Sequence, residues 1–223
     1  MNDSRHALVV TGGPYPGHVL AEMADDLPGA DVVVAADGGA RSARLLGLTV
    51  DILVGDLDSA DDHAVATAGE VRHHPVDKDD TDLELALATV VDAGIDSATV
   101  VATLAGRADH ALGNLLVVAG DRWAGLRLDL RVDGTHCRVV RDAWQIVGNP
   151  GDVVSLLAVG GPATGVTTTG LAWTLGDAVL QPGLGLGLSN RMTAPTAEVR
   201  VSSGVLLVFG GGSERPSCPN DAG

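Results

Sequence analysis

The sequence is poor in basic residues, and lysine occurs only once, as Lys78. Its 14 basic residues are outnumbered by 29 acidic ones, which gives a formal net charge of −15 at pH 7. A nucleic-acid-binding surface needs a basic patch to displace counterions, so this charge argues against nucleic acid as a partner. A phosphate ligand would have to be bound mostly by arginines, whose planar guanidinium suits phosphate oxygens.

Cysteines, aromatic residues and long apolar runs are also scarce. Cys137 and Cys218 are too few and too unevenly placed to form a disulfide framework. No apolar run approaches the length that a bilayer requires, and no signal-peptide pattern opens the chain. We therefore expect a cytoplasmic protein that does not contact a membrane. Because aromatic residues make up only 2% of the 223 residues, the core must be built from Val, Leu and Ala.

Short apolar runs alternate with helical patterns up to about Val132. The runs predict strands at Ala7–Thr11, Asp31–Ala36, Ile52–Gly55, Thr99–Ala102 and Leu126–Val132. The segments between them predict helices near Val19–Leu27, Ala40–Leu46, Asp61–Ala68, Thr81–Ala93 and Asp109–Ala119. Alternation of this kind is typical of βαβ units, so we expect an α/β domain with a mainly parallel sheet and helices on both faces.

Helical periodicity fades after Asp133-Gly134, and short β-like segments follow. They predict strands at His136–Arg141, Gln145–Val147, Val153–Leu157, Gly165–Thr169, Leu171–Leu175, Ala197–Val201 and Val205–Phe209. Turn signals such as Gly160-Gly161-Pro162 separate them and indicate a small all-β sandwich or barrel. The expected domains are an α/β domain over residues 1–133, a β-rich domain over residues 134–212 and a flexible tail over residues 213–223.

Two short acidic clusters carry the strongest functional signal. Asp56 and Asp58 directly follow the predicted strand Ile52–Gly55, and ligands in α/β sheets bind beyond the carboxyl ends of such strands. The second cluster consists of Asp77, Asp79, Asp80 and Asp82. Like charges this close repel one another unless they share a cation, and an all-oxygen ligand set suits Mg²⁺ better than zinc. Magnesium in turn indicates a polyphosphate substrate.

A purely structural interpretation of the same residues is also open. Aspartates are common in turns because their side chains bond nearby main-chain N–H groups. Thr81 and Glu84 have the spacing of a capping box, which places Asp82 in the first turn of a helix. There it could simply compensate the helix dipole.

Several other residues suit a nucleotide site. Gly38 and Gly39 follow a predicted strand and permit close approach of the backbone to a ligand. Arg107 suits a phosphate or ribose contact, or equally a surface ion pair with Asp109. Asp109 also suits the N-cap of the following helix, and His110 is either a nucleotide contact or an ordinary first-turn residue.

Trp173 lies in the predicted strand Leu171–Leu175 and allows two interpretations. Most tryptophans belong to a core. In a chain with so few aromatic residues, a tryptophan beside Gly170 is also a candidate platform for a cationic ring.

Six motifs, in this order, resemble those of the thiamine pyrophosphokinase (thiamine diphosphokinase) family. They are Ala36-Asp37-Gly38-Gly39-Ala40, Gly55-Asp56-Leu57-Asp58-Ser59, Asp77-Lys78-Asp79-Asp80-Thr81-Asp82, Gly106-Arg107-Ala108-Asp109-His110 leading to Asn114, Thr169-Gly170-Leu171-Ala172-Trp173 and Leu188-Ser189-Asn190. Together they run through nearly the whole chain. Two positions depart from the pattern: Ala172, where the family often has Lys or another polar residue, and Ala105, where it has a second Gly.

The resemblance implies that the chain transfers the pyrophosphoryl group of ATP to thiamine, with Mg²⁺ as cofactor, and forms a homodimer with the substrate site at its interface. By the family pattern, the catalytic and metal-binding carboxylates are Asp56, Asp58, Asp79 and Asp82. The residues expected to bind ATP are Asp37, Gly38, Gly39, Thr81, Arg107, Asp109 and His110. The residues expected to bind thiamine are Trp173, Ser189 and Asn190.

Other functions remain open at this point. The nucleotide half would serve equally well in a diphosphokinase for another alcohol, such as a hydroxymethyl pterin, although Trp173 and Ser189-Asn190 favour thiamine. A non-catalytic nucleotide-sensing module would not need the complete carboxylate clusters. A dinucleotide-dependent oxidoreductase is supported only by the glycines between Gly12 and Gly17.

Overall fold

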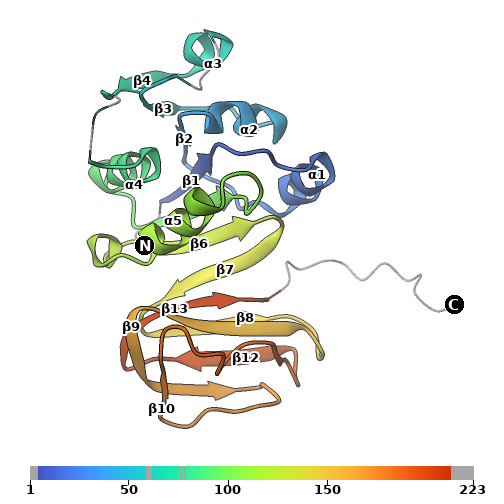
Figure 1. Ribbon diagram of the computed structural model, residues 1–223. Coiled ribbons are helices and arrows are strands. Elements are labelled where there is room, and N and C mark those ends of the chain that lie inside the picture. Colours follow the sequence, from blue (N-terminus) through green and yellow to red (C-terminus); the bar gives the residue numbers. More distant parts are fainter. Residues whose placement is uncertain (1–4, 59–61, 76, 78, 212–223) are drawn as a thin grey trace, which may run out of the picture. The chain divides into compact units, whose positions relative to one another are not determined.

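The computed structural model describes residues 5–58, 62–75, 77 and 79–211, and its helices and strands are shown in Figure 1. The chain divides into two compact units, Met1–Gly134 and Thr135–Gly223. Within the described ranges, no helix is both long and apolar enough to cross a membrane.

The first unit is a parallel sheet whose strands alternate with helices. Its elements are β1 (His6–Thr11), α1 (Gly17–Asp26), β2 (Val32–Ala36), α2 (Gly39–Leu45), β3 (Ile52–Gly55), α3 (Asp62–Thr67), β4 (Glu70–His73), α4 (Asp82–Asp92), β5 (Ser97–Ala102), α5 (Ala108–Val118), the 3₁₀ helix η1 (Asp121–Trp123) and β6 (Arg127–Val132). The strand order is β4-β3-β2-β1-β5-β6, and each neighbouring pair is parallel. The predicted α/β fold with a mainly parallel sheet is confirmed.

Apolar side chains are buried on both faces of this sheet. On one face, Leu20 and Met23 of α1 pack in a cluster with Leu8 of β1. Val9 and Val34 point to the other face, because successive residues of a strand alternate, and both are fully buried. Helix α4 lies against β1, β2 and β3. Two layers of helices therefore enclose the strands, as expected for a parallel sheet.

Strand β4 is the one element of this sheet that the apolar pattern does not predict. Its residues Glu70, Val71 and His73 are exposed and Arg72 is only half-buried. It pairs with β3 through its main chain. A strand that buries no side chain leaves no run of apolar residues in the sequence, so hydrophobicity cannot reveal it.

The second unit consists of antiparallel strands arranged around one long strand. Its elements are β7 (Thr135–Val140), β8 (Ala143–Val147), β9 (Val153–Thr169), β10 (Ala178–Leu180), β11 (Asn190–Arg191), β12 (Thr196–Arg200) and β13 (Ser203–Phe209). The order is β7-β13-β9-β12-β8, and β10 and β11 also pair with β9. The predicted β-rich fold is confirmed.

Strand β9 is continuous where the sequence predicts two strands and a turn. It runs through Gly160-Gly161-Pro162 without a break. Gly160 and Gly165 have positive φ values of 74° and 66°, and the pairing with β13 shifts register near its end. The glycines therefore produce a bulge and a bend rather than a reversal of the chain. The bend carries β9 from its pairing with β13 to its pairing with β12.

The predicted strand Leu171–Leu175 is wrong. Within this segment Leu171 alone makes a β-bridge, to Met192. Gly170 has a φ of 70°, and the segment turns back so that the main-chain N–H of Thr168 donates to the carbonyl of Leu175 at 3.0 Å. A left-handed glycine at its start ends the extended conformation.

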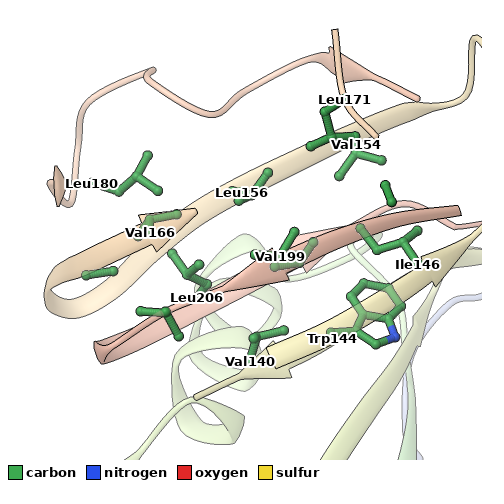
Figure 2. Close-up of a cluster of buried hydrophobic side chains, with 14 of the residues drawn as sticks. Val140, Trp144, Ile146, Val154, Leu156, Val166, Leu171, Leu180, Val199 and Leu206 are labelled. Carbon is green, nitrogen blue, oxygen red and sulfur yellow. The ribbon is translucent and has the colours of Figure 1, made fainter. Parts of the chain in front are cut away.

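The core of the second unit is aliphatic apart from one aromatic ring. Figure 2 shows Val140, Ile146, Leu156, Val199 and Leu206 in a single cluster of buried side chains. Trp144 belongs to the same cluster and is 7% exposed. The aromatic-poor composition predicts this kind of core.

Candidate active site

The first unit contains a cleft of about 560 Å³ at the carboxyl ends of its central strands. Its walls are residues 11–13 after β1, residues 36–38 after β2 and residues 80–83 at the start of α4. Helix α5 contributes Asp109, His110, Gly113, Asn114 and Val117. In the strand order, β1 lies between β2 and β5, so the chain reverses its direction of winding there. Such a switch point is where open α/β sheets bind their ligands.

Two glycines near this cleft, Gly39 and Gly55, allow main-chain segments to approach one another. A methyl group on Gly39 would clash with the carbonyl of Val10, so only glycine lets α2 begin this close to β1. A methyl group on Gly55, at the end of β3, would lie 3.0 Å from Cβ of Asp37 and 3.2 Å from Oδ1 of Asp82. Gly55 therefore leaves space in which two carboxylates from distant segments come close together.

Three carboxylates converge beside this glycine. Asp37, Asp56 and Asp58 each offer an oxygen, and these oxygens lie within 4.8 Å of one another. Asp37 and Leu57 adopt left-handed backbone conformations, with φ of 45° and 66°. Such conformations are costly outside glycine and concentrate at functional sites. An all-oxygen set of this size fits a hard divalent cation such as Mg²⁺.

The turn interpretation of the first acidic cluster also holds. Oδ1 of Asp56 accepts a hydrogen bond from the main-chain N–H of Asp58 at 3.2 Å, as in an Asx turn. One oxygen of Asp56 thus shapes the loop, and this does not prevent the carboxylates from serving a metal.

The amino end of α4 carries the predicted capping box. Oγ1 of Thr81 accepts from the main-chain N–H of Glu84 at 3.3 Å, and the Glu84 carboxylate accepts from the N–H of Thr81 at 2.9 Å. This cap fixes the first turn of the helix, and Asp82 within that turn lines the cleft. The acidic residues just before the helix differ in their surroundings. Asp79 is exposed and lies outside the lining, whereas Asp80 belongs to it.

Asp80 forms an ion pair with Arg122, a residue that the motifs do not indicate. Nη1 of Arg122 donates to Oδ1 of Asp80 at 2.8 Å, and the Arg122 guanidinium stacks 4.7 Å from the ring centre of Trp123. Arg122 comes from η1, which is distant from the acidic segment in sequence. Neither spacing nor periodicity could have revealed the contact.

Arg107 and Asp109 form the ion pair that the sequence allows. Nη2 of Arg107 lies 2.6 Å from Oδ2 of Asp109, and the hydrogen bond from Arg107 lowers the pKa of the Asp109 carboxyl to about 2. The two side chains are 70% and 66% exposed, so the pair contributes little to stability. Asp109 is not the N-cap, because α5 begins at Ala108 with Arg107 before it.

The side of α5 that faces the cleft combines predicted and additional residues. Asp109 and His110 line it, as do Gly113, Asn114 and Val117 one and two turns further on. Gly113, Asn114 and Val117 follow His110 at i+3, i+4 and i+7, which places these four residues on one helical face. Helical spacing could therefore have extended the prediction beyond His110.

The three residues expected to bind thiamine come together in the second unit. Trp173 is 62% exposed, which rules out the core interpretation. Asn190 is buried, and its amide makes two hydrogen bonds to the main chain of Trp173. Ser189 is exposed with a φ of 57°, and its N–H donates to Oγ of Ser155 at 3.0 Å. The indole side chain is thus presented to solvent on a fixed main chain.

A cleft at the switch point of a parallel sheet, with a cluster of carboxylates beside it, is the arrangement of the class of α/β proteins that bind small ligands beyond their strand ends. Comparison with family models gives the particular reaction. Residues 25–124 match the model of the thiamin pyrophosphokinase catalytic domain, and residues 145–206 match that of the thiamin pyrophosphokinase vitamin B1 binding domain. The chain belongs to the thiamin pyrophosphokinase family. Its activity is thiamine diphosphokinase, the transfer of a pyrophosphoryl group from ATP to thiamine.

Solved structures show the same fold. Thiamine pyrophosphokinase from Bacillus subtilis is 20% identical, with a TM-score of 0.78 and coverage of 93% of this chain and 99% of that one. The Candida albicans enzyme is 12% identical, with a TM-score of 0.70 and coverage of 92% and 89%. The yeast enzyme is 13% identical, with a TM-score of 0.65 and coverage of 94% and 87%. A comparison with curated protein sequences found no match.

Proposed function

We propose that the cleft of the first unit binds ATP as its magnesium complex and that the surface around Trp173 in the second unit binds thiamine. The observation that carries the first half is the convergence of Asp37, Asp56 and Asp58 beside the cleft. The second half rests on an indole ring that is 62% exposed in a chain with only three tryptophans.

The proposed metal ligands are Asp37, Asp56 and Asp58, with Asp82 and Asp79 of the second acidic segment as further candidates. The closeness of Asp82 Oδ1 to Gly55 supports its inclusion. When bound, Mg²⁺ would neutralise charge on the non-bridging phosphate oxygens.

The remaining cleft residues would hold the nucleotide in place. Gly12, Gly13 and Gly38 expose main chain to the ligand, and the positive ends of the α4 and α5 helix dipoles suit phosphate oxygens. His110 and Asn114 can donate hydrogen bonds from one face of α5. Arg107 adds a positive charge beside the helix start.

Catalysis would then consist mainly of positioning. The hydroxyl of thiamine has to lie in line with the β-phosphorus, and a loose transition state needs little help from a base. A carboxylate such as Asp58 could accept the alcohol proton. We rank its role in orienting the phosphates above its role as a base.

For thiamine, the proposed contact is a cation–π interaction between the positively charged thiazolium ring and Trp173. The exposed hydroxyl of Ser189 is a candidate hydrogen-bonding partner. Asn190 would act on thiamine indirectly, by holding the main chain of Trp173, because both polar atoms of its amide already bond main-chain groups.

We also propose that the active form is a cytoplasmic homodimer with the substrate site at its interface. Family membership and the supply of ATP in the cytoplasm support this. Leu184, Leu186 and Leu188 are 65%, 54% and 47% exposed on one loop, which suits contact with a partner or a substrate. Asp58→Asn has little activity, and Trp173→Ala has little activity when thiamine is well below its raised KM. Under that condition, a mixture of the two proteins should be more active than the sum of the two alone if each site uses residues of both subunits.

The decisive experiment identifies both products. Purified protein incubated with ATP, Mg²⁺ and thiamine should give AMP and thiamine diphosphate in equal amounts. A chelator that removes Mg²⁺ should abolish turnover. Formation of ADP and thiamine monophosphate would contradict pyrophosphoryl transfer. Full turnover in the presence of the chelator would contradict the metal site.

A further inference from the structure

The connection between β5 and α5 is held by one carboxylate at the end of β6. Oγ1 of Thr103 donates to Oδ1 of Asp133 at 2.6 Å, and the main-chain N–H of Leu104 donates to Oδ2 at 2.9 Å. The N–H of Ala105 donates to Oγ1 of Thr103 at 3.1 Å. The main chain of Asp133 is fixed in turn, because its N–H donates to the carbonyl of Ala102 at 3.2 Å. Both carboxylate oxygens are thus engaged by neighbouring residues of one loop.

Few side chains of this loop are buried. The side chain of Leu104 is 53% exposed, and that of Arg107 is 70% exposed. Thr103 is the exception, at 7% exposure, and its hydroxyl is the group that bonds Asp133. The loop therefore depends on hydrogen bonds for its conformation, and those to a carboxylate are the strongest of them.

The same loop packs against Gly13 and Pro14 in the segment after β1, and Gly13 lines the cleft. A methyl group on Gly13 would clash with Cγ2 of Thr103. A methyl group on Gly106, whose φ is 85°, would lie 3.0 Å from the ring of Pro14. The loop thus contacts the segment after β1 on one side and continues into α5 on the other. Residues of both segments line the cleft.

We propose that Asp133 is a positioning residue for the nucleotide, although it does not line the cleft itself. Acting through Thr103 and the main chain of Leu104, its carboxylate fixes the β5–α5 connection. That connection determines the position of the amino end of α5 relative to Gly12 and Gly13, which also line the cleft. The inference rests on the proposed ATP site.

Two substitutions test the contact with little change of shape. Thr103→Val removes the hydroxyl and keeps the methyl group beside Gly13. Asp133→Asn offers one acceptor oxygen where two donors need one each. Since the lost bonds involve a charged acceptor, each variant should raise KM for ATP about tenfold, with KM for thiamine changed less than about twofold.

Matched variants separate this effect from a general loss of stability. Thr99→Val is the first control. Thr99 is a buried threonine of β5 whose hydroxyl hydrogen-bonds Nε2 of His6 and does not line the cleft. Its substitution should leave both KM values unchanged. Thr103→Ser restores the hydroxyl and should recover most of the affinity for ATP. An unchanged KM for ATP in folded Thr103→Val and Asp133→Asn proteins would overturn the inference, as would equal rises in both KM values.

Direct binding of a fluorescent ATP analogue with Mg²⁺ distinguishes the inference from the proposed function. If wild-type protein binds the analogue and the two variants bind it about tenfold more weakly, Asp133 acts on the nucleotide site. If wild-type and variant proteins bind equally, the inference fails and the site stands. If wild-type protein does not bind the analogue, the proposed site itself is overturned.

Discussion

The side-chain amide of Asn190 pairs with the main chain of Trp173 as a neighbouring strand would. Oδ1 of Asn190 accepts from the N–H of Trp173 at 3.0 Å, and Nδ2 donates to its carbonyl at 2.7 Å. Oδ1 also accepts from the N–H of Arg191 at 2.8 Å. Asn190 is 4% exposed, whereas the indole it supports is 62% exposed. A buried amide therefore sets the position of an exposed aromatic ring.

Trp173→Ala should weaken thiamine binding and leave ATP binding unchanged. Loss of one stacked cationic contact costs on the order of 1–2 kcal/mol, which raises KM for thiamine about ten- to thirtyfold. The melting temperature should change little, because the side chain is mostly exposed. Steady-state kinetics with each substrate varied in turn, alongside thermal melts, provide the measurement. A sharp fall in melting temperature with both KM values raised would contradict a role for Trp173 that is limited to thiamine binding.

Asn190→Ala should act on thiamine through Trp173 and also destabilise the second unit. The substitution leaves the N–H and carbonyl of Trp173 without their buried partner, at a cost of about 1–3 kcal/mol. If Asn190 works through the indole, the effects of Asn190→Ala and Trp173→Ala on KM for thiamine should be far from additive in a double-mutant cycle. Additive effects would indicate that the two residues contribute independently.

Asp58→Asn should lower kcat by at least about a hundredfold with the fold intact, because it removes a metal-positioning group. Wild-type protein should melt at a higher temperature when Mg²⁺ is added, and the variant should lose most of that rise. Without metal the variant should be at least as stable as the wild type, since it relieves repulsion among three close carboxylates. Asp62→Asn, on the exposed first turn of α3, is the control. An unaltered magnesium response in Asp58→Asn would argue against the proposed cluster.

Asp82 and Asp79 should respond differently to the same substitution. Asp82 lines the cleft near Gly55, whereas Asp79 is exposed outside it. We expect Asp82→Asn to reduce kcat at least about a hundredfold and Asp79→Asn to have a smaller effect. Comparison of kcat for the two purified variants decides the matter. Near-normal turnover in Asp82→Asn would show that Asp82 has no part in catalysis and only compensates the helix dipole.

His6 should make the protein less stable as the pH falls. Its Nδ1 lies 2.9 Å from Oγ of Ser97, which donates to the carbonyl of Arg5, so the neutral ring with a proton on Nδ1 fits the site. Burial lowers the pKa of His6 below 6.5; nearby Asp129 and Asp31 act against this shift, and Arg127 adds to it.

The stabilising effect of neutral His6 is therefore complete above pH 6.5 and is lost as the pH falls through the folded-state pKa. Melting temperatures measured between about pH 8 and pH 5 should fall more steeply for wild-type protein than for His6→Gln. His18→Gln, at an exposed site on α1, should follow the wild type. Parallel curves for wild type and His6→Gln would rule out this effect.

In the parallel sheet, the strands that bury apolar side chains were predictable, and the one exposed strand was missed. Burial left apolar runs in the sequence for β1, β2 and β3, and all three appear near the expected residues. The exposed strand β4 left none. Gly160-Gly161-Pro162 was misread because glycine permits a bulge as readily as a turn, and only cross-strand pairing decides between them.

In the candidate site, contacts within one helical turn were predictable from the sequence, and contacts between distant segments were not. Local spacing predicted the capping box of Thr81 and Glu84, because that contact spans a single helical turn. The grouping of Asp37 with Asp56 and Asp58 depends on how β2 and β3 align, which sequence spacing does not reveal. The bonds from Asp133 to Thr103 likewise join segments that only the folded sheet brings together.

Strand β9 has a consequence for how the second unit opens. Its 17 residues pair with β13 along Ser155–Thr164, with β12 along Thr167–Thr169, and with β10 and β11 at further positions. No partner can detach without exposing amides of this shared strand. Hydrogen exchange should therefore proceed in β9 and its neighbours with one common opening free energy. The thiamine-binding half would then behave as a single cooperative block, rather than as hairpins that open one at a time.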